Sequence, residues 1–563
     1  MEGPTNPSRH STVDPSSGYC SATKTFHSLR PPAPLPPPSH PLSVSHYALS
    51  LLPSFSSSSS SSTFLVNASS GDRLPYPDFL RRVRSLALSL QSRFSLSKGD
   101  VAFILAPTSL HVPVIYFSLL SIGVVVSPTN PLGSPSEIAR QVHLCQPAIA
   151  FSTSQIAPKL PPVPQGTVLI DSPEFESMLT QYSSSSSGDC PVAETLPPNR
   201  VEQSDSAAIM FSSGTTGRVK GVLLTHRNLI ALLAGHYQMR LERPEPEPQP
   251  VSLFTLPLFH MFGFLALLRA FAFRETVVLM EKFDFVAMLR AIEKYRVTHM
   301  PVPPPLIVAF VKLEIAGKYD LSSLHLLICG GAPLGKEVAD RFRERFPHVE
   351  IALGYGLTET SGAATRMSGP EEANHHGSVG RIHPNMKAKI VDPTTGDVLA
   401  PGQRGELWLR GPTIMKCYVG DERATAETID SDGWLRTGDL CYIDSEGFLF
   451  IVDRLKELIK YKAYQVAPAE LEHLLHSIPD VVDAAVIPYP DEEAGQIPMA
   501  FVVRKPGSNI TESQIMDFIA KQVAPYKKIR RVAFISSIPK SPAGKILRRE
   551  LVNLATSVRS AKL

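Results

Sequence analysis

The chain has 563 residues, with 55 lysines and arginines against 52 aspartates and glutamates, a formal net charge of +3. With 43% hydrophobic and 19% charged residues, its composition is that of a folded protein and excludes a chain disordered throughout. The near-zero charge also excludes a global field that would attract nucleic acid or a membrane surface, so an anionic ligand needs a few placed cations. At about 150 residues per domain, the length predicts roughly two to four domains.

The positions of the prolines, cysteines and apolar stretches further limit which class of protein this chain can be. Prolines cluster at residues 31–38 and 244–250, which predicts loops there, because proline neither continues a helix nor donates regularly to a sheet. The six cysteines show no C-x-x-C spacing, which argues against a disulfide framework or a zinc site. Residues 112–126 are too few, and residues 253–280 too interrupted by basic side chains, to cross a membrane, so we expect buried strands and helices there.

In chain order, short apolar runs first alternate with amphipathic segments. Strands are predicted at residues 101–105 and 124–128, and helices at residues 109–120 and 136–144. This β-α-β-α order predicts a mainly parallel sheet covered by helices. The same order returns in five later segments, at residues 251–256, 277–280, 285–295, 325–329 and 336–346.

The last third of the chain has a different pattern. After residue 456 the order of elements becomes β-α-β-β-α, with helices predicted at residues 468–476 and 512–523. We therefore place a domain boundary at residues 453–458. Just before it, three segments are typical of short strands with glycine turns and predict a smaller β unit: residues 404–410, 433–442 and 448–452.

The strongest chemical signal is a loop at residues 211–221, which reads Phe-Ser-Ser-Gly-Thr-Thr-Gly-Arg-Val-Lys-Gly and follows the apolar run 207–210. A strand that leads into such a loop suits triphosphate recognition, because glycines let backbone N–H groups approach oxygen, while hydroxyls and Lys220 add donors. The loop lacks the Walker spacing G-x-x-x-x-G-K-[ST]. The alternative interpretation is a Ser/Thr/Gly turn with no ligand.

This loop resembles the signature loop of the adenylate-forming (acyl-activating) enzymes, and the chain is most similar to plant 4-coumarate:CoA ligase-like proteins. The similarity covers roughly residues 26–549. Six further motifs agree in order and spacing: Leu-Pro-Leu-Phe-His at 256–260, Gly-Tyr-Gly-Leu-Thr-Glu at 354–359, Gly-Glu-Leu-Trp-Leu-Arg-Gly at 405–411, Thr-Gly-Asp at 437–439, Val-Asp-Arg-Leu-Lys-Glu at 452–457 and Pro-Lys-Ser-Pro-Ala-Gly-Lys at 539–545.

The resemblance implies an α/β fold with two unequal parts. A large N-terminal domain of stacked α/β subdomains plus a small β unit would be followed by a small, mobile α+β C-terminal domain. We divide the chain into a flexible tail at residues 1–25, an N-terminal adenylation domain at residues 26–455, a C-terminal domain at residues 456–550 and a terminal segment at residues 551–563.

The resemblance also implies two half-reactions that use ATP, Mg²⁺ and coenzyme A. A carboxylate first attacks the α-phosphorus of ATP, so anion meets anion and the site needs Mg²⁺ and fixed cations. By resemblance, Glu359 is the Mg²⁺ carboxylate, Asp439 accepts hydrogen bonds from the ribose hydroxyls with support from Arg454, and Tyr355 packs against adenine. The other implied nucleotide contacts are Ser212, Ser213, Gly214, Thr215, Thr216, Gly217, Lys220, Gly354, Gly356 and Thr358.

The C-terminal residues are assigned to different stages by the same resemblance. Lys545 would enter the site for adenylation and bridge the acyl carboxylate and the α-phosphate. The domain would then swing about a hinge at Lys456 and bring in Lys460 and Gln465, which assist the later attack by the thiol. Two further residues of the same segment are implied to lie beside the cofactor, Lys462 and Ala463.

The resemblance places the carboxylic acid beside His260, which would also gate the tunnel for the thiol. Phe262 stands where 4-coumarate ligases commonly carry tyrosine, and phenylalanine cannot hydrogen-bond a ring hydroxyl of the substrate. The pocket is therefore expected to be roomy and apolar. Three small residues would complete its lining, Gly330, Gly331 and Ala332.

We therefore expect an ATP-dependent carboxylic acid:CoA ligase that forms an acyl-AMP and then an acyl-CoA thioester from an aromatic acid of the hydroxycinnamate or benzoate type, or from a fatty or oxylipin acid. Family members usually carry glycine where this chain has Ala463. This difference leaves an adenylating enzyme with another acceptor as an alternative, and a catalytically inactive nucleotide-binding protein as a third. Five intact residues argue against the third: Lys220, Glu359, Asp439, Arg454 and Lys545.

The chain ends in Ala561-Lys562-Leu563, a small-basic-leucine tripeptide that resembles the peroxisomal address Ser-Lys-Leu. It predicts a peroxisomal protein that binds the peroxisomal import receptor. The rival interpretation is an organellar transit peptide, since residues 1–50 hold only two acidic residues and many serines. We expect no nucleic-acid partner and no membrane span.

Overall fold

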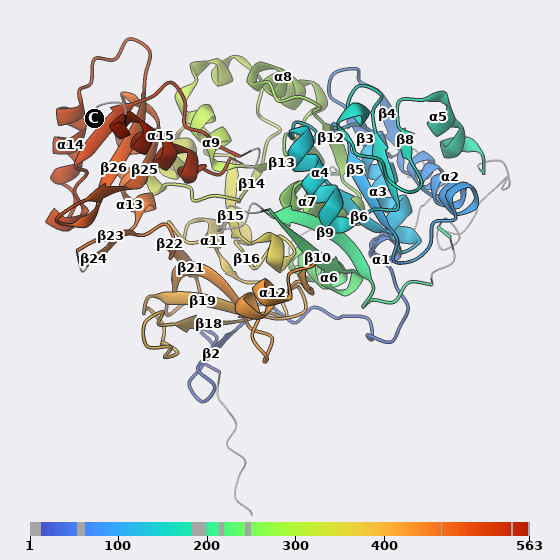
Figure 1. Ribbon diagram of the computed structural model, residues 1–563, viewed down its shortest axis with the longest axis horizontal. Coiled ribbons are helices and arrows are strands. Elements are labelled where there is room, and N and C mark those ends of the chain that lie inside the picture. The colour runs from blue at the N-terminus through green and yellow to red at the C-terminus, as the bar shows by residue number, and fades with distance from the viewer. Residues whose placement is uncertain are drawn as a thin grey trace, which may run out of the picture.

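The computed structural model describes residues 13–52, 62–182, 196–197, 200–212, 219–242, 249–462, 464–541 and 544–560 (Figure 1). Strands within these residues form sheets of seven, nine, six and five strands. The first three belong to the N-terminal part, and the five-stranded sheet forms the C-terminal domain, drawn in orange to red at the left of Figure 1. The predicted α/β fold with a large and a small part is confirmed.

The seven-stranded sheet contains the first predicted β-α-β-α segment. Its centre is parallel, because β5 pairs with β6 and β7 in the same direction, and the predicted strand bounds differ from the observed ones by at most one residue. In sheet order the strands are β20 (Cys417–Tyr418), β10 (Lys220–Thr225), β9 (Ser206–Ser212), β6 (Val125–Pro128), β5 (Val101–Leu105), β7 (Ile149–Ser152) and β8 (Thr167–Leu169). The helices of this region are α1 (Val44–Ser50), α2 (Tyr76–Phe94), α3 (His111–Ser121), α4 (Pro135–Cys145), α5 (Pro173–Thr180) and α6 (His226–Leu241).

The nine-stranded sheet has a parallel centre in which β12, β11, β13, β14 and β15 are neighbours. In sheet order the strands are β17 (Arg381–Ile382), β16 (Thr365–Arg366), β15 (Glu350–Tyr355), β14 (Leu326–Cys329), β13 (His299–Val302), β11 (Val251–Phe254), β12 (Thr276–Leu279), β3 (Thr63–Asn67) and β4 (Arg73–Pro75). The helices of this region are α7 (Met261–Ala272), α8 (Phe285–Tyr295), α9 (Pro304–Lys312), α10 (Lys336–Arg345) and α11 (Gly369–Ala373).

The two apolar stretches weighed as membrane spans are interior elements. Helix α3 is buried along ten of its eleven residues, and α7 along eleven of its twelve. A helix that is apolar on every side belongs in the core of a large protein, where both contribute to one hydrophobic cluster. No helix among the described residues is long and apolar enough to cross a membrane.

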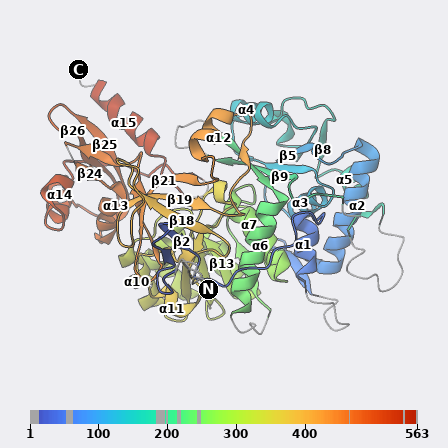
Figure 2. The same cartoon turned by 90° about the horizontal axis from the view of Figure 1, so that it is seen from below.

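The predicted β unit is a six-stranded antiparallel sheet accompanied by α12 (Glu422–Thr428). Figure 2 shows its orange strands between the C-terminal domain and helices α6 and α7. In sheet order the strands are β1 (Tyr19–Cys20), β2 (Thr25–His27), β18 (Lys387–Val391), β19 (Gly405–Arg410), β21 (Leu435–Ile443) and β22 (Leu449–Arg454). The expectation of a flexible tail through residue 25 was wrong for residues 13–25, because β1 pairs with β2, and β2 pairs with β18.

The C-terminal domain begins where β22 ends, inside the predicted boundary at residues 453–458. Its elements in chain order are β23 (Ile459–Tyr461), β24 (Tyr464–Val466), α13 (Pro468–Ser477), β25 (Val481–Asp491), β26 (Gly495–Arg504), α14 (Glu512–Ala520), β27 (Arg531–Phe534) and α15 (Arg548–Ser560). The expected terminal segment from residue 551 was also placed too early. Leu551 lies fully buried in the core of this domain, because α15 packs against β25.

Several helices begin at side chains that cap them. In α4, the Ser134 hydroxyl accepts a hydrogen bond from the Glu137 N–H, and the Glu137 carboxylate accepts one from the Ser134 N–H. Thr511 and Gln514 form the same reciprocal pair at the start of α14. Such pairs satisfy backbone N–H groups that have no partner within the helix, which fixes where the helix starts.

One arginine joins the elements of the C-terminal domain to the domain boundary. The Nε of Arg548, at the start of α15, lies 2.7 Å from the Glu457 carboxylate, and its Nη2 lies 3.0 Å from the carboxylate of Glu472 on α13. Arg548 also donates to the Val486 carbonyl of β25 at 3.1 Å. The two carboxylates raise the pKa of the Arg548 guanidinium, although its burial acts in the opposite direction.

We expect Arg548→Met to destabilise the C-terminal domain by about 3–5 kcal/mol, because it leaves the buried carboxylate of Glu472 without its cation and removes one cation from the half-buried Glu457. Urea unfolding followed by circular dichroism measures the change. Arg549→Met is the matched control, since the neighbouring Arg549 is exposed, and it should cost no more than about 0.5 kcal/mol. Equal midpoints for the two variants would contradict the proposed importance of this network.

Candidate active site

A cavity of ≈ 690 Å³ lies where the N-terminal sheets, the β unit and the C-terminal domain meet. Its size is within the range of about 300–1,000 Å³ that is usual for small-molecule sites. The lining combines β9, β10, β15, the start of α7 and the C-terminal residues Ser541 and Lys545. Of the predicted site residues, the lining includes Ser212, Lys220, His260, Phe262, Gly330, Gly331, Gly354, Tyr355, Gly356, Thr358, Glu359, Arg454, Lys456 and Lys545.

Asp439 does not line the cavity itself, but its carboxylate contacts two residues that do. Strands β21 and β22 place Asp439 opposite Arg454, whose Nε lies 3.4 Å from the Asp439 carboxylate. The hydroxyl of Tyr355 donates to the same carboxylate at 2.6 Å. Asp439 is only 3% exposed, and this burial raises its pKa despite the opposing effect of Arg454. The result is a fixed acceptor at the cavity edge.

Glu359 sits in a 3-10 helix, Thr358–Thr360, directly after β15. Its Oε1 accepts a hydrogen bond from the Tyr418 hydroxyl at 2.8 Å and a longer one from Ser212 at 3.4 Å. The Nζ of Lys220 lies 4.2 Å from the centre of the Tyr418 ring. The structure therefore brings together three residues predicted from the sequence: Glu359 contacts Ser212 and Tyr418, and Lys220 lies over the Tyr418 ring.

Sequence reasoning missed Tyr418. It lies in the two-residue strand β20, which pairs with Val222 and Leu223 of β10 far away in the chain. A pair of residues carries no periodicity, and Tyr418 belongs to none of the motifs quoted above. Only the pairing of β20 with β10 reveals its place beside Glu359.

Lys545 reaches the cavity from the C-terminal domain. The loop that carries it packs against the start of α9, where a Cβ on Gly544 would lie 3.2 Å from Pro303. Gly544 also has a φ of +82°, so glycine suits both the conformation and the close approach. Burial, together with the nearby Arg454, lowers the pKa of the Lys545 ammonium, while the carboxylates of Glu457 and Asp439 raise it.

Three predicted residues lie elsewhere, on the hairpin of β23 and β24. Lys460 and Gln465 are opposite each other in its register, and both are exposed. Lys462 is also exposed and pairs with Glu493 at 2.8 Å. None of the three lines the cavity, and neither does Ala332. The remaining predicted residues lie outside the described part of the chain: Ser213, Gly214, Thr215, Thr216, Gly217 and Ala463.

His260 lines the cavity next to two apolar neighbours in the chain, Met261 and Phe262. It caps the start of α7, where its Nδ1 accepts a hydrogen bond from the Phe262 N–H at 3.2 Å. Burial lowers the pKa of the His260 imidazole, so the ring is neutral at neutral pH. The Phe262 ring lies 3.8 Å from the position that a Cβ on Gly330 would occupy, so glycine at 330 leaves room there.

The described residues contain no group of three or more histidine, cysteine, aspartate and glutamate side chains that could hold a metal ion. Glu359 is one of three glutamates that line the cavity, with Glu406 and Glu427, and it is the one that follows β15 directly. One carboxylate suits Mg²⁺, which keeps several waters and binds through one or two carboxylates plus substrate phosphates. It does not suit a metal that needs a complete protein cage.

Comparison with known proteins identifies the family. A profile of the AMP-binding enzymes matches residues 56–419, and a profile of the AMP-binding enzyme C-terminal domain matches residues 470–545. The chain belongs to the AMP-binding enzyme family. The second match ends at Lys545, one of the residues of the C-terminal domain that line the cavity of this AMP-binding enzyme.

Individual relatives cover nearly the whole chain. The chain is 60% identical to 4-coumarate–CoA ligase-like 9 of Arabidopsis thaliana, covering 99% of both chains. It is 46% identical to the peroxisomal OPC-8:0-CoA ligase 1 of the same plant, covering 97% of this chain and 99% of that one. Among solved structures, ATP-bound MatB from Rhodopseudomonas palustris superposes with a TM-score of 0.79 at 25% identity, covering 92% of this chain and 100% of that one.

Replacing Tyr418 by phenylalanine tests its importance to this AMP-binding enzyme. Tyr418→Phe removes the 2.8 Å donor to Glu359 and keeps the ring beside Lys220. Since a hydrogen bond to a charged group is worth about 1.5–3 kcal/mol, we expect acyl-adenylate formation to fall about 10- to 100-fold. Pyrophosphate release measures it. Tyr442→Phe, on β21 outside the cavity lining, should change little; an equal loss would contradict a specific role.

Proposed function

We propose that this protein is an ATP-dependent carboxylic acid:CoA ligase. The observation that carries this proposal is the cavity itself, in which Lys220, Glu359 and Tyr355 of the N-terminal part meet Lys545 of the C-terminal domain. Such a set of cations, hydroxyl groups and carboxylates suits a reaction between two anions. The names of the relatives, which include CoA ligases, agree with the same chemistry.

In the first half-reaction, a carboxylate oxygen of the acid attacks the α-phosphorus of ATP, and the bond to pyrophosphate breaks. Lys545 and Lys220 would stabilise the negative charge that collects on the phosphate oxygens. Asp439 would accept hydrogen bonds from the ribose hydroxyls once Tyr355 turns its own hydroxyl away. Glu359 would hold Mg²⁺, which neutralises phosphate charge.

In the second half-reaction, the thiol of coenzyme A attacks the acyl carbon and AMP leaves. We propose that the C-terminal domain turns at Lys456, so that Lys545 withdraws and the hairpin with Lys460 and Gln465 takes its place. The exposed position of this hairpin, outside the cavity that Lys545 enters, supports the proposal. The two moving parts would meet at the boundary predicted at residues 453–458.

The acid would enter the apolar part of the cavity beyond His260. Phe262, Gly330 and Gly331 line this part, which favours an aromatic acid or a fatty or oxylipin acid over a small polar one. The alternative of an adenylating enzyme with a different acceptor rests on Ala463, since the family usually carries glycine there. A catalytically inactive nucleotide-binding protein has less support, because the charged residues of the cavity are present.

Two readouts on one panel of acids separate these possibilities. Fatty, oxylipin, benzoic and cinnamic acids are assayed for pyrophosphate release and, separately, for CoA thioester. We expect both products from at least one acid. Pyrophosphate without thioester would favour another acceptor, and neither product from any acid would favour the inactive protein.

Lys545→Ala and Lys460→Ala test the division of labour between the half-reactions. Lys545→Ala should lower pyrophosphate release about 10²- to 10³-fold, the usual cost of one lost electrostatic contact, and leave thioester formation from a synthetic acyl adenylate unchanged. Lys460→Ala should show the reverse pattern. Lys282→Ala, an exposed lysine on the surface, is the control. If Lys545→Ala slowed both half-reactions equally, the division would be disproved.

We also propose that the protein is peroxisomal and that residues 561–563 bind the import receptor. The resemblance of the tripeptide to Ser-Lys-Leu and the peroxisomal relative support this address. A fluorescent fusion carrying the last three residues should enter peroxisomes, and the same fusion without them should stay outside. A peroxisomal signal that survives the deletion would refute the address.

A further inference from the structure

The chain between β2 and α1 contacts the regions of all three N-terminal sheets. We call residues 26–44 the N-terminal strap, and Figure 1 shows it running from β2 to α1. Its first two residues lie in β2, which pairs with β18 of the β unit. Arg30 donates to the Arg366 carbonyl of the nine-stranded sheet at 2.9 Å. Beside the seven-stranded sheet, Arg227 of α6 donates to the Pro36 carbonyl at 2.6 Å.

The proline cluster of the strap is met by side chains that donate hydrogen bonds to it. Asn385 donates to the Ala33 carbonyl at 2.8 Å. Gln203 donates to the carbonyls of Pro37 and His40 at 2.7 and 2.9 Å. Proline offers a carbonyl acceptor but no N–H, so donating side chains satisfy such a segment and few donors remain to be paired. These contacts fix the strap against the N-terminal part.

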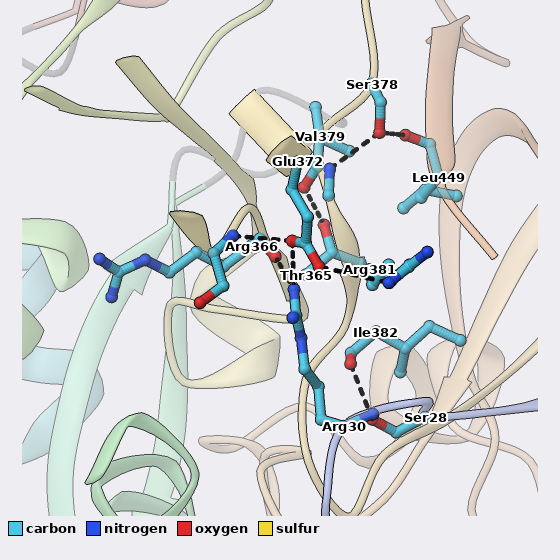
Figure 3. Close-up of polar contacts among 12 residues, drawn as sticks. Ser28, Arg30, Thr365, Arg366, Glu372, Ser378, Val379, Arg381, Ile382 and Leu449 are labelled. Atoms are coloured by element: carbon cyan, nitrogen blue, oxygen red, sulfur yellow. Dashed lines mark hydrogen bonds and ion pairs between the residues drawn. The ribbon is translucent and has the colours of Figure 1, made fainter. Parts of the chain in front are cut away.

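Arg30 ties the strap to two elements near the cavity. Its side chain is 8% exposed and forms an ion pair with Glu372 of α11, whose side chain is 10% exposed. The Glu372 carboxylate also accepts from the Ser368 N–H at 2.7 Å and lies 3.5 Å from Arg381. Figure 3 shows Arg30 ending beside the Glu372 carboxylate and the Arg366 backbone. One buried cation therefore joins the strap to α11 and β16.

Strand β16 transmits this contact to β15 because the strands around it are closely packed. It has only two residues, so it forms few ladder hydrogen bonds of its own. Gly354 and Tyr355 of β15 lie opposite its two residues. A Cβ on Gly354 would lie 3.2 Å from the Thr365 carbonyl, and a Cβ on Gly380 would lie 2.2 Å from the Arg366 backbone. With so little free space, a shift of β16 must move β15 as well.

Strand β15 carries part of the cavity wall that is proposed above to bind the nucleotide. Gly354 and Tyr355 line the cavity, and the Tyr355 hydroxyl donates to Asp439 at 2.6 Å. Arg30 does not line the cavity, so it can affect a ligand only through these strands. A displaced β15 would change the position of the Tyr355 ring and of its contact with Asp439.

We propose that Arg30 is a positioning residue for the nucleotide. By holding the Arg366 carbonyl it fixes β16, and through β16 it fixes the wall formed by Gly354 and Tyr355. A guanidinium suits this role because one of its nitrogens carries two N–H groups, which serve the carbonyl and the Glu372 carboxylate at the same time. The proposal rests on the nucleotide role of the cavity that is proposed above.

AMP binding to the full-length protein tests this role. Isothermal titration compares the dissociation constant of AMP for the wild type and for Arg30→Met. We expect the variant to bind AMP about 10-fold more weakly, the order of one lost hydrogen bond from a charged group. Arg30→Lys should recover part of the affinity, since an ammonium can still donate to the Arg366 carbonyl. Wild-type affinity in Arg30→Met would overturn the proposal.

Arg381→Met is the matched control, since Arg381 contacts the same carboxylate of Glu372. Its other contacts are the Phe448 ring, 4.4 Å away, and the Glu446 carbonyl at 3.2 Å, so this variant removes a cation but no bond to the β16 carbonyl. Both variants should unfold at lower urea concentrations than the wild type. Arg381→Met should nevertheless bind AMP within about 2-fold of the wild type. Equal weakening in both variants would indicate a general structural effect and overturn the proposal.

A double variant serves if Arg30→Met alone does not fold. Arg30→Met/Glu372→Gln removes the cation together with its anion, and the glutamine keeps an acceptor oxygen for the Ser368 N–H. We expect the same loss of about 10-fold in AMP affinity, because the bond to the Arg366 carbonyl is still missing. Glu372→Gln alone keeps this bond and should bind AMP as the wild type does. Equal affinities of the double and the single variant would refute the positioning role.

Measuring AMP binding keeps this test separate from that of the ligase reaction, because it needs neither an acid nor coenzyme A. Weaker AMP binding in Arg30→Met, with no pyrophosphate from any acid in the wild type, would refute the ligase function and support the positioning role. Pyrophosphate and thioester from the wild type, with equal AMP affinities in the wild type and Arg30→Met, would support the ligase function and refute the positioning role.

Discussion

The position of the Lys545 loop depends on the half-buried guanidinium of Arg548. Lys545, three residues before Arg548, lines the cavity. Arg548 itself contacts Glu457 beside the domain boundary and Glu472 on α13. Because the buried carboxylate of Glu472 would otherwise lack a cation, Arg548 holds the end of the Lys545 loop against the start of the C-terminal domain. A hydrogen bond also crosses the domain boundary: the Asp453 carboxylate accepts it from the Ala469 N–H of α13 at 2.9 Å. Burial raises the pKa of Asp453 to about 6.

Charged residues of both signs meet at the cavity. Three cations line it, Lys220, Arg454 and Lys545. Glu359 on its wall and Asp439 next to it are carboxylates that already accept hydrogen bonds from tyrosine hydroxyls. These tyrosines satisfy the carboxylates before a ligand arrives, and under the proposed function a ribose and a hydrated metal ion would replace them. The side chains are therefore positioned in advance, which reduces the reorganisation that binding requires.

Helix α7 supplies one face of the cavity. Its capping residue His260 lines the cavity, and so do Phe262, Ala266 and Arg269, which follow one another along a single face of the helix. Under the proposed function, this face would contact the carboxylic acid.

Much of the fold, and many of the residues that line the cavity, could be predicted because their signals are local. The alternation of apolar runs marked β5, α3, β6 and α8, and the loop motifs carried Lys220, Glu359, Asp439 and Lys545 within a few consecutive residues each. The end of the flexible tail and the start of the terminal segment at residue 551 were misplaced, since β1 is too short to show periodicity and Leu551 is buried only through packing on β25.

By itself, the sequence determined the class of protein and the chemistry of its loops, because glycines, hydroxyls and charged residues at set spacings constrain the local backbone. Only the tertiary structure decided which distant residues meet. Tyr418 meets Glu359 through the pairing of β20 with β10, and His236, Arg269 and Arg366 line one cavity from three separate elements. Side chains that converge from separate strands and helices leave no spacing in the chain, since their proximity is set by sheet pairing and core packing.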